Sequence, residues 1–468
     1  MNLITVVSFV IFLVLFFTIG LASVVKSKGT SQDYYLANQS ISPLFSGLSA
    51  VATNNSGYMF IGVIGYTYAV GLASVWLMIG WILGDFLASL FIHKKLHIAT
   101  TQSGEASYSG VLATWFGDEM IYWRRIAAVL TLIFLGAYAA AQIAAGSKAL
   151  VGVLNWNRTA GAWVVAAMVL SYSVAGGIRA SIWTDVAQSF VMLAAMIVLV
   201  ISGVMAYGGI TSVIQAWQSI PGYFDLAPEG IVLPGLLGVL LFFLGWLVAG
   251  LSVIGQPHIM VRFMALNHSA NFKKTRFYYY GFFVVFYALA TIAGMLARLH
   301  LPELNDLDPE LALPTMAVKL LPPALVGVVL AGIFAATMST ADSLVLSCSS
   351  AITHDLLPNG AKSKTIMKTA TAVVTGLALM IALYASANVF DLVIMSWSIM
   401  AVAFGPLLIL FTIQRKVTEK IAIAMIVLGV LIALLWRQAN LHHLVYEGLP
   451  AMLAALLFGY LFSIKIKR

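Results

Sequence analysis

The sequence predicts an all-α integral membrane protein with about thirteen transmembrane helices. Of its 468 residues, 61% are hydrophobic and only 9% are charged. A water-soluble protein of this length needs more charged residues to cover its surface. Apolar stretches of about 20 residues, enough to cross roughly 30 Å of hydrocarbon, recur from one end of the chain to the other.

The composition excludes several other classes of protein. Cys348 is the only cysteine, so a disulfide-stabilised scaffold is ruled out. The eight histidines form no metal-ligand pattern, and the chain has no phosphate-binding glycine loop. We therefore expect neither an enzyme nor a transporter driven by ATP.

The predicted spans follow one another with short loops. The first is an anchor rather than a signal peptide, because no Lys or Arg precedes it and no small-residue cleavage site follows it. The approximate limits of the thirteen spans are 3–24, 43–71, 75–92, 126–151, 159–176, 183–207, 232–261, 277–298, 323–353, 366–387, 391–413, 419–436 and 446–464.

The basic residues predict the orientation of these spans. If the N-terminus lies outside, thirteen spans place every second loop and the C-terminus in the cytoplasm. All but five of the 25 Lys and Arg residues then belong to the cytoplasmic loops; the exceptions are Lys148, Arg158, Arg298, Lys319 and Arg437. This bias follows the positive-inside rule. The net charge of +8 therefore reflects topology in the plasma (inner) membrane. We expect the lipid bilayer as its surroundings, with no nucleic-acid partner and no obligatory protein partner.

Two spans contain polar, helix-weakening runs at mid-depth, namely TNNSG (Thr53–Gly57) and SVIGQP (Ser252–Pro257). Backbone groups freed there are costly in hydrocarbon unless protein, solute or ion satisfies them, so a matched pair of breaks indicates a transport site. The alternative is that Gly and Pro only kink packed helices. The breaks lie five spans apart and so cross the membrane in opposite directions, as an inverted repeat of spans 2–6 and 7–11 requires.

The ninth predicted span carries hydroxyl groups along one face. They recur with Ala336 at three- and four-residue spacing, at Ser339, Thr340, Ser343, Ser347 and Ser350. Neutral hydroxyls and carbonyls suit a sodium ion, because they hold it without trapping it. The alternative is that these hydroxyls bond to their own helix and let neighbouring helices approach.

Four acidic residues lie inside spans or at their ends, at Asp85, Asp185, Asp342 and Asp391. A carboxylate inside a membrane is a functional candidate by default. Asp342 lies beside the hydroxyl stripe, where it could favour a cation or exchange a proton, whereas Asp185 and Asp391 could equally be solvated caps. We expect no Lys or Arg in the middle of any span. The carboxylate of a solute would then be held by helix N-termini, amides or a cation.

Several motifs resemble the sodium/solute symporter family, and the most similar branch is that of the sodium/proline symporters. They are DYYLANQSIS (Asp33–Ser42), SIWTDVAQ (Ser181–Gln188), GQPHIMVRFMA (Gly255–Ala265), FAATMSTADS (Phe334–Ser343), SSAITHDL (Ser349–Leu356) and FGPLL (Phe404–Leu408). The resemblance implies a leucine-transporter-type core of 5+5 helices in an inverted repeat. On this division the chain consists of an N-terminal span and loop (1–42), a first repeat (43–207), a second repeat (208–415) and two C-terminal spans (416–468).

The resemblance also implies cation sites. The family's conserved sodium site corresponds to the backbone carbonyls of Ala52 and Asn55, together with Ala336, Ser339 and Thr340. A second cation site of some members would correspond to Asp185, Ser339, Asp342 and Ser343. Asp342 replaces the usual hydroxyl there, so a second sodium, a proton or a fixed charge all remain open.

The solute pocket departs from the proline branch. Ala249 and Val253 stand where that branch has Trp and Tyr, and Asn54 stands where it usually has Asp, whereas the branch's pocket tyrosine is retained as Tyr138. Each candidate for the pocket is also explained by core packing or helix bonding. The candidates are Asn54, Ser56, Tyr138, Gln142, Ser252, Gln256 and Trp397.

The expected function is secondary active transport. A sodium-coupled symporter would import a small organic solute, such as proline or another amino-acid-like molecule, by alternating access. The alternatives are a proton-coupled symporter, a membrane sensor that keeps the symporter fold, and a channel.

Overall fold

The computed structural model describes residues 2–26, 28–227, 233, 235–306, 308–357, 363–384 and 389–466. Within them, ten helical stretches are long and apolar enough to cross a membrane, and two shorter apolar helices accompany these. The stretch Pro43–Ser103 alone contains two of the predicted spans. The all-α membrane architecture is therefore confirmed, while the number of thirteen crossings stays a prediction.

The first half of the chain begins with a helix that lies apart from the two breaks. Its helices are α1 (Leu3–Val24), α2 (Ser31–Leu36), η1 (Ala37–Gln39), α3 (Pro43–Gly57), η2 (Tyr58–Val63), α4 (Ile64–Val70), η3 (Gly71–Ser74), α5 (Val75–Ala88), η4 (Ser89–His93), α6 (Lys94–Ser103), α7 (Tyr108–Ala113), α8 (Ile121–Leu154) and α9 (Arg158–Ala206).

The second half contains the other break and the only strands among the described residues, each two residues long. Its elements are α10 (Ile210–Ser219), α11 (Gly235–Leu251), η5 (Ser252–Gly255), α12 (Pro257–Met264), η6 (Ser269–Asn271), α13 (Phe272–His300), η7 (Pro302–Asp306), η8 (Pro309–Leu311), α14 (Ala312–Leu320), α15 (Pro323–Ser350), η9 (Ala351–Leu356), α16 (Lys364–Tyr384), α17 (Val389–Thr412), β1 (Arg415–Lys416), α18 (Glu419–Gln438), η11 (Leu441–His443), α19 (Gly448–Leu461) and β2 (Ile464–Lys465).

Two segments that the sequence predicts as loops are helical in the structure. The predicted spans 159–176 and 183–207 are two helices that meet directly at a kink at Gly177 (φ +58°) and together make up α9. A Cβ atom at Gly177 would lie 2.4 Å from the carbonyl oxygen of Tyr34, so glycine is needed there. Helical structure also continues beyond residue 92 through η4 and α6, so Lys94 and Lys95 lie on a helix and not in a loop.

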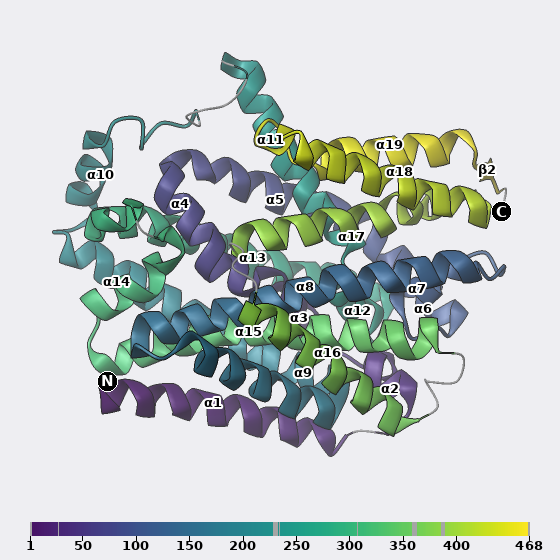
Figure 1. The fold of residues 1–468 in the computed structure, drawn as a ribbon, viewed down its shortest axis with the longest axis horizontal. Helices are drawn as coiled ribbons and strands as arrows, with labels where there is room; N and C mark the ends of the chain where they lie inside the picture. Colours follow the sequence, from purple (N-terminus) through teal and green to yellow (C-terminus); the bar gives the residue numbers. More distant parts are fainter. Residues whose placement is uncertain are drawn as a thin grey trace.

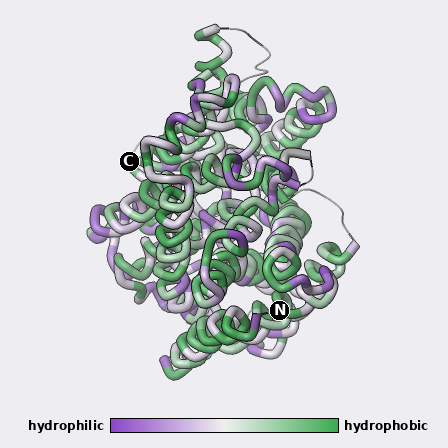
Figure 2. The backbone as a smooth tube through the Cα atoms, turned by 90° about the vertical axis from the view of Figure 1, so that its left-hand side faces the viewer, coloured by the Kyte–Doolittle hydropathy of each residue, from purple (hydrophilic) through white to green (hydrophobic). Residues whose placement is uncertain are grey.

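Helix α15 lies at the centre of the fold. It packs against α1, α3, α8, α9 and α16 (Figure 1). Hydrophobic residues, coloured green in Figure 2, recur along many of the helices. Large exposed hydrophobic side chains occur on separate helices, for example Leu3, Ile133, Leu236, Leu435 and Leu457. This surface fits a lipid environment.

The connecting segments gather at two opposite ends of the helices. At one end β1 pairs with β2, and Lys95 Nζ donates to the carbonyl of Thr412 (2.8 Å). At the other end Lys148 pairs with Glu310 (2.5 Å) and Arg437 with Glu447 (2.9 Å). In Figure 1 the first end is on the right with the C-terminus, and the second is on the left with the N-terminus.

The end that carries β1, β2, α6 and α7 is called the basic end below, because most of the predicted cytoplasmic Lys and Arg residues gather there. Of the predicted orientation set, Lys362, Lys467 and Arg468 lie outside the described residues. So do positions 232, 234 and 385–387 of two predicted spans.

Close packing of α5 on α11 generates the first prediction. A Cβ atom at Gly84 would lie 1.9 Å from the carbonyl oxygen of Leu247, and the methyl group has no room because both helix backbones are in contact. We expect Gly84→Ala to lower the free energy of unfolding by about 1–3 kcal/mol. Gly136→Ala on α8, where nothing lies within 4 Å, is the control. Equal thermal unfolding temperatures of the two variants in detergent would contradict this packing.

Candidate transport site

The first break interrupts α3 at Ser56. This residue has φ 48° and ψ 178°, a backbone conformation that residues other than glycine rarely adopt. Its hydroxyl oxygen accepts a hydrogen bond from the backbone N–H of Tyr58 (3.0 Å), and a wider helical turn, η2, follows. The predicted interruption at Thr53–Gly57 is confirmed.

The second break separates α11 from α12. Helix α11 ends at Leu251, a tight turn covers Ser252–Gly255, and Gln256 is extended with φ −102° and ψ 93°. Pro257 then begins α12, at the position where the missing N–H of proline costs nothing. A Cβ atom at Gly255 would lie 2.4 Å from Cα of Ala401, so this turn touches the backbone of α17. The interruption predicted at Ser252–Pro257 is confirmed as well.

Helix α8 connects the two breaks. Tyr138 donates its hydroxyl to Oγ of Ser56 (3.3 Å), and its ring meets the imidazole of His258 edge to face at 5.5 Å. Gln142 accepts a hydrogen bond from the backbone N–H of Gly57 at its Oε1 atom (2.8 Å). Thus one helix contacts the residue that breaks α3 and the first turn of α12.

Helix α17 contacts the second break from the other side. The carbonyl of Trp397 accepts a hydrogen bond from Nε2 of Gln256 (2.9 Å), which also donates to the carbonyl of Ser252 (3.3 Å). The Trp397 ring lies 6.4 Å from the His258 ring. Six of the seven predicted pocket residues therefore lie along the two breaks; they are Ser56, Tyr138, Gln142, Ser252, Gln256 and Trp397.

Asn54 is the predicted pocket residue that points elsewhere. Its amide nitrogen donates to Oδ2 of Asp85 (3.0 Å) and to the hydroxyl of Tyr279 (2.6 Å). Asp85 is on α5 and Tyr279 on α13, so the Asn54 side chain bonds to these two helices and not to α8 or α17 among the described residues.

Several polar atoms around the breaks have no hydrogen-bond partner in the described part of the chain. They belong to fully or almost fully buried residues and are Tyr58 Oη, Gln142 Nε2, Gln256 Oε1, and both Nδ1 and Nε2 of His258. Buried polar atoms are normally paired, so each of these needs an explanation. A polar ligand between the breaks would supply the missing partners.

Ala336, Ser339 and Thr340 of the predicted sodium site lie where α15 contacts the end of α3 at Ala52 and Thr53. Ser339 donates its hydroxyl to the carbonyl of Ala52 (3.2 Å) and to that of Ala336 (3.1 Å). Thr340 donates to the carbonyl of Thr53 (2.8 Å), a residue that the predicted set did not include. Asn55 is fully buried at the end of the same segment, and neither atom of its amide has a partner among the described residues. These neutral oxygens are suited to a monovalent cation.

Arg262 contacts two of the four residues of the predicted second cation site, Asp185 and Ser343. Its guanidinium donates to Ser181 Oγ (2.8 Å) and to Ser343 Oγ, and it pairs with Asp185 Oδ2 at 3.5 Å. The same side chain donates to Ser49 Oγ (3.3 Å). Asp342 lies next to Ser343 and accepts its hydroxyl (2.9 Å).

One expectation about this region is wrong, and one of the alternatives left open for Asp185 is excluded. Arg262 was expected in a loop, but α12 continues to Met264 and the arginine is 1% exposed. Asp185 is not a solvated cap, because it is fully buried within α9 and pairs with Arg262. Asp391, by contrast, is exposed and lies near Arg437 (3.4 Å).

The sequence indicates that Arg262 and His258 lie close to the site, although neither belongs to the predicted site residues. Both belong to the GQPHIMVRFMA motif, and their spacing of four residues places them on one face of the helix that starts at the second break. The His258 ring contacts Tyr138 and Trp397, its Nδ1 and Nε2 have no partner among the described residues, and its carbonyl accepts a hydrogen bond from Arg262.

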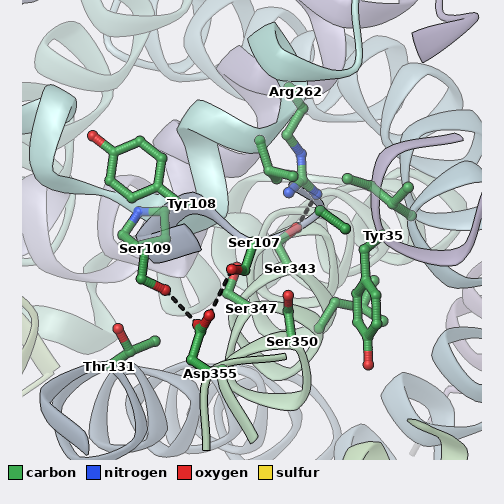
Figure 3. Close-up of a pocket in the computed structure, with 16 residues that line it drawn as sticks. Tyr35, Ser107, Tyr108, Ser109, Thr131, Arg262, Ser343, Ser347, Ser350 and Asp355 are labelled. Carbon is green, nitrogen blue, oxygen red and sulfur yellow. Dashed lines mark hydrogen bonds between the residues drawn. The ribbon is translucent and has the colours of Figure 1, made fainter. Parts of the chain in front are cut away.

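A cavity lies on the basic side of the breaks (Figure 3). The hydroxyl face of α15 lines it at Ser343, Ser347 and Ser350, and Arg262 closes one end. At the other end Asp355 accepts hydrogen bonds from Ser107 Oγ (2.7 Å), from Ser109 Oγ and from Arg124 Nε (2.7 Å). The stripe predicted from sequence thus faces a cavity, lined by both polar and apolar residues, along part of its length.

Aromatic side chains cover the opposite side of the breaks. The Tyr58 ring lies between Trp81 (5.7 Å) and Phe390 (5.3 Å), and Phe390 stacks on Tyr66 (5.4 Å). Trp81 also contacts Trp397 (5.1 Å). Aromatic rings therefore pack around Tyr58 and Trp397 at the breaks, while the cavity of Figure 3 reaches Pro257, the first residue of α12.

Solved structures with the same arrangement are membrane transporters. A substrate-bound, outward-open Na+-coupled sialic acid symporter matches with a TM-score of 0.81 at 16% identity, covering 100% of both chains. MhsT in complex with L-phenylalanine matches with a TM-score of 0.59 at 14% identity, covering 90% of this chain and 99% of that one. The fold is the leucine-transporter type, as the motifs implied.

The sequence comparisons define the family. A model of the sodium:solute symporter family matches residues 34–434. The high-affinity proline transporter PutP of Bacillus subtilis (strain 168) is 29% identical over 450 residues, covering 94% of this chain and 93% of the relative. The sodium/proline symporter of Escherichia coli (strain K12) is 28% identical, covering 93% and 87%. The chain belongs to the sodium:solute symporter family, and it is a membrane transport protein and not an enzyme.

The buried ion pair generates the second prediction. Arg262→Gln would leave Asp185 without its charged partner, so we expect a loss of about 3–5 kcal/mol in the free energy of unfolding. The double variant Asp185→Asn with Arg262→Gln removes both charges and should recover part of this loss. Thermal unfolding in detergent measures both effects, with the exposed Arg125→Gln as the control. A double variant that is less stable than the single variant would contradict the pairing.

Proposed function

We propose that this protein is a sodium-coupled symporter that imports a small amino-acid-like solute, with proline as the first candidate. Membership of the sodium:solute symporter family supports sodium coupling, and the proline-transporting relatives support the solute class. The observation that carries the proposal is the contact between the freed carbonyls of α3 and the hydroxyls of α15.

Sodium would bind where this contact is made. Its ligands would be the carbonyls of Ala52, Asn55 and Ala336 and the hydroxyls of Ser339 and Thr340. Both hydroxyls now donate to carbonyls, so rotation of each O–H turns a donor and its acceptor into two oxygen ligands. The ion would thereby fix the broken end of α3 next to the solute.

The solute would bind between the two breaks. Gln142 Nε2 is a donor and Gln256 Oε1 an acceptor without partners in the described structure, and they suit the carboxylate and the amino or imino group of an amino acid. The rings of Tyr138, His258 and Trp397 would contact its apolar part. Ser56 and Ser252 complete the proposed pocket, whereas Asn54 acts from outside it.

A single sodium would drive each cycle. We propose that the guanidinium of Arg262 takes the place of a second cation among Asp185, Ser339, Asp342 and Ser343. One sodium crossing about 100 mV contributes roughly 2.3 kcal/mol, and a tenfold gradient adds about 1.4 kcal/mol. Together these allow accumulation of a neutral solute by several hundredfold.

The basic end would face the cytoplasm, with the N-terminus outside the plasma (inner) membrane. The positive-inside rule supports this orientation. Sodium and solute would then leave through the cavity lined by the hydroxyl face of α15. The two inverted repeats, 43–207 and 208–415, would rock against each other to open the site to either side in turn.

Thr340 provides the direct test of the sodium site. Thr340→Ala removes one proposed ligand, so the sodium concentration for half-maximal uptake in proteoliposomes should rise about tenfold, which corresponds to about 1.4 kcal/mol. Thr375→Ala is the matched control, because this buried threonine of α16 bonds only its own helix, at Thr371 (2.9 Å). Unchanged sodium activation in Thr340→Ala, or uptake driven equally by a proton gradient without sodium, would refute the assignment.

A solute screen tests the pocket. An amino-acid-like solute at about 100 times its Kd should stabilise the protein by about 2.7 kcal/mol, and more in sodium than in potassium. Thermal shifts with proline, other amino acids, sugars and small carboxylates measure this. Gln256→Leu removes an unpartnered acceptor and should weaken the shift, while Gln218→Leu on the exposed side of α10 should not. A sugar that shifts the protein while no amino acid does would overturn the proposed solute class.

A further inference from the structure

Asp85 is a buried carboxylate for which the proposed transport mechanism has no use. It lies on α5 with no exposed surface. Its Oδ2 atom accepts hydrogen bonds from Tyr279 (2.6 Å) and Asn54 (3.0 Å), and its Oδ1 atom accepts one from Tyr280 (2.7 Å). All three donors are neutral, and they come from α3 and α13.

Among the described residues, no basic side chain neutralises this carboxylate. None of the ion pairs among the described residues includes Asp85. Arg276, one turn before Tyr280 on α13, donates to its own helix at Phe272 (3.4 Å). His93, two turns further along α5 and η4, stacks on Phe263 at 3.9 Å. Helix α11, which packs against α5, carries no titratable residue.

A buried carboxylate without a counter-ion can be neutralised by a proton. Asp85 would then need an acceptor for its new O–H group, and Asn54 offers one. The Oδ1 atom of Asn54 is buried and has no partner in the described structure, while Nδ2 of the same amide faces Asp85. Rotation of the amide exchanges the two atoms, so Oδ1 would then accept the new O–H of Asp85.

Asn54 connects this event to the sodium site. It lies between Thr53, whose carbonyl accepts from Thr340, and Asn55, a proposed sodium ligand. Ala52, two residues before it, accepts from Ser339. A change in the hydrogen bonds of Asn54 therefore acts directly on the unwound end of α3.

We infer that Asp85 is a proton-binding site, and that its charge sets the affinity of the sodium site at the crossing of α3 and α15. The inference rests on the sodium site of the proposed function. Ionised Asp85 attracts sodium and holds Asn54 in its present orientation, whereas protonated Asp85 does neither. Sodium and the proton bind at separate sites that are negatively coupled. The binding of either one therefore lowers the affinity for the other by the same factor.

The test measures sodium binding against pH in the purified full-length protein. Sodium chloride replaces choline chloride at constant ionic strength, and thermal stabilisation gives the half-saturating sodium concentration. In the native protein this concentration should fall about tenfold from mildly acidic to mildly alkaline pH, within the usual range of coupling between two sites. Asp85→Asn should bind sodium weakly at every pH, and Asp85→Glu should retain the pH dependence. Asp225→Asn, in an exposed loop, is the matched control.

A second measurement does not depend on sodium. Infrared difference spectra between acidic and alkaline pH should contain a carboxylic acid C=O band that is absent from Asp85→Asn.

If that variant does not fold, Tyr280→Phe removes one donor to the ionised carboxylate and should move the midpoint of sodium binding to higher pH. Unaltered pH dependence in Asp85→Asn or an unmoved midpoint in Tyr280→Phe would overturn the inference, as would a band that persists without Asp85. A native protein that shows the band but no response to sodium would instead refute the proposed sodium site.

Discussion

A helix broken inside a membrane leaves backbone groups that water cannot reach, and this constraint organises the structure. At the first break the carbonyls of Ala52 and Thr53 accept hydrogen bonds from hydroxyls of α15, and the N–H of Gly57 donates to the side chain of Gln142. At the second, Trp397 Nε1 donates to the carbonyl of Ala249 (2.8 Å), and Tyr108 donates to that of Ile254. Helices α7, α8, α15 and α17 thus lie where the breaks require partners, and the same polar groups are available to a sodium ion and a solute.

A buried charge, the guanidinium of Arg262, also stabilises this arrangement. The guanidinium of Arg262 joins α12 to α3, α9 and α15 through hydroxyls and a carboxylate, so the helix after the second break is tied to the neighbours of the first. A charge taken out of water is costly unless it is paired and fully hydrogen-bonded, and removal of one partner is more disruptive than removal of both. Such a group fixes the position of a short helix better than apolar packing alone, because its hydrogen bonds have preferred directions.

The candidate site was predictable where one helix or one short run supplies several residues. Ala336, Ser339 and Thr340 lie within two turns of α15, and the polar run of α3 is contiguous, so their spacing indicated a shared surface. Prediction failed where a side chain's direction depends on packing. Asn54 is adjacent to Asn55 but faces α5 and α13, and Arg262 lies one residue beyond a predicted span yet reaches α9 and α15. The spacing of polar residues along a helix does not show which neighbouring helix each side chain contacts.

The sequence by itself determined that the chain is helical and resides in a membrane, because few charges and repeated apolar stretches leave no other way to satisfy the backbone. It also located both breaks, because Asn, Ser, Gly and Pro weaken helices at those points. Only the tertiary structure decided that α9 bends at Gly177 without a loop, that Arg262 pairs with Asp185, and that Asp85 lies against Asn54 with no counter-ion in the described part of the chain. These features join residues that are distant in sequence, and their energies depend on burial and on the direction of each polar group, which exist only once the helices have packed.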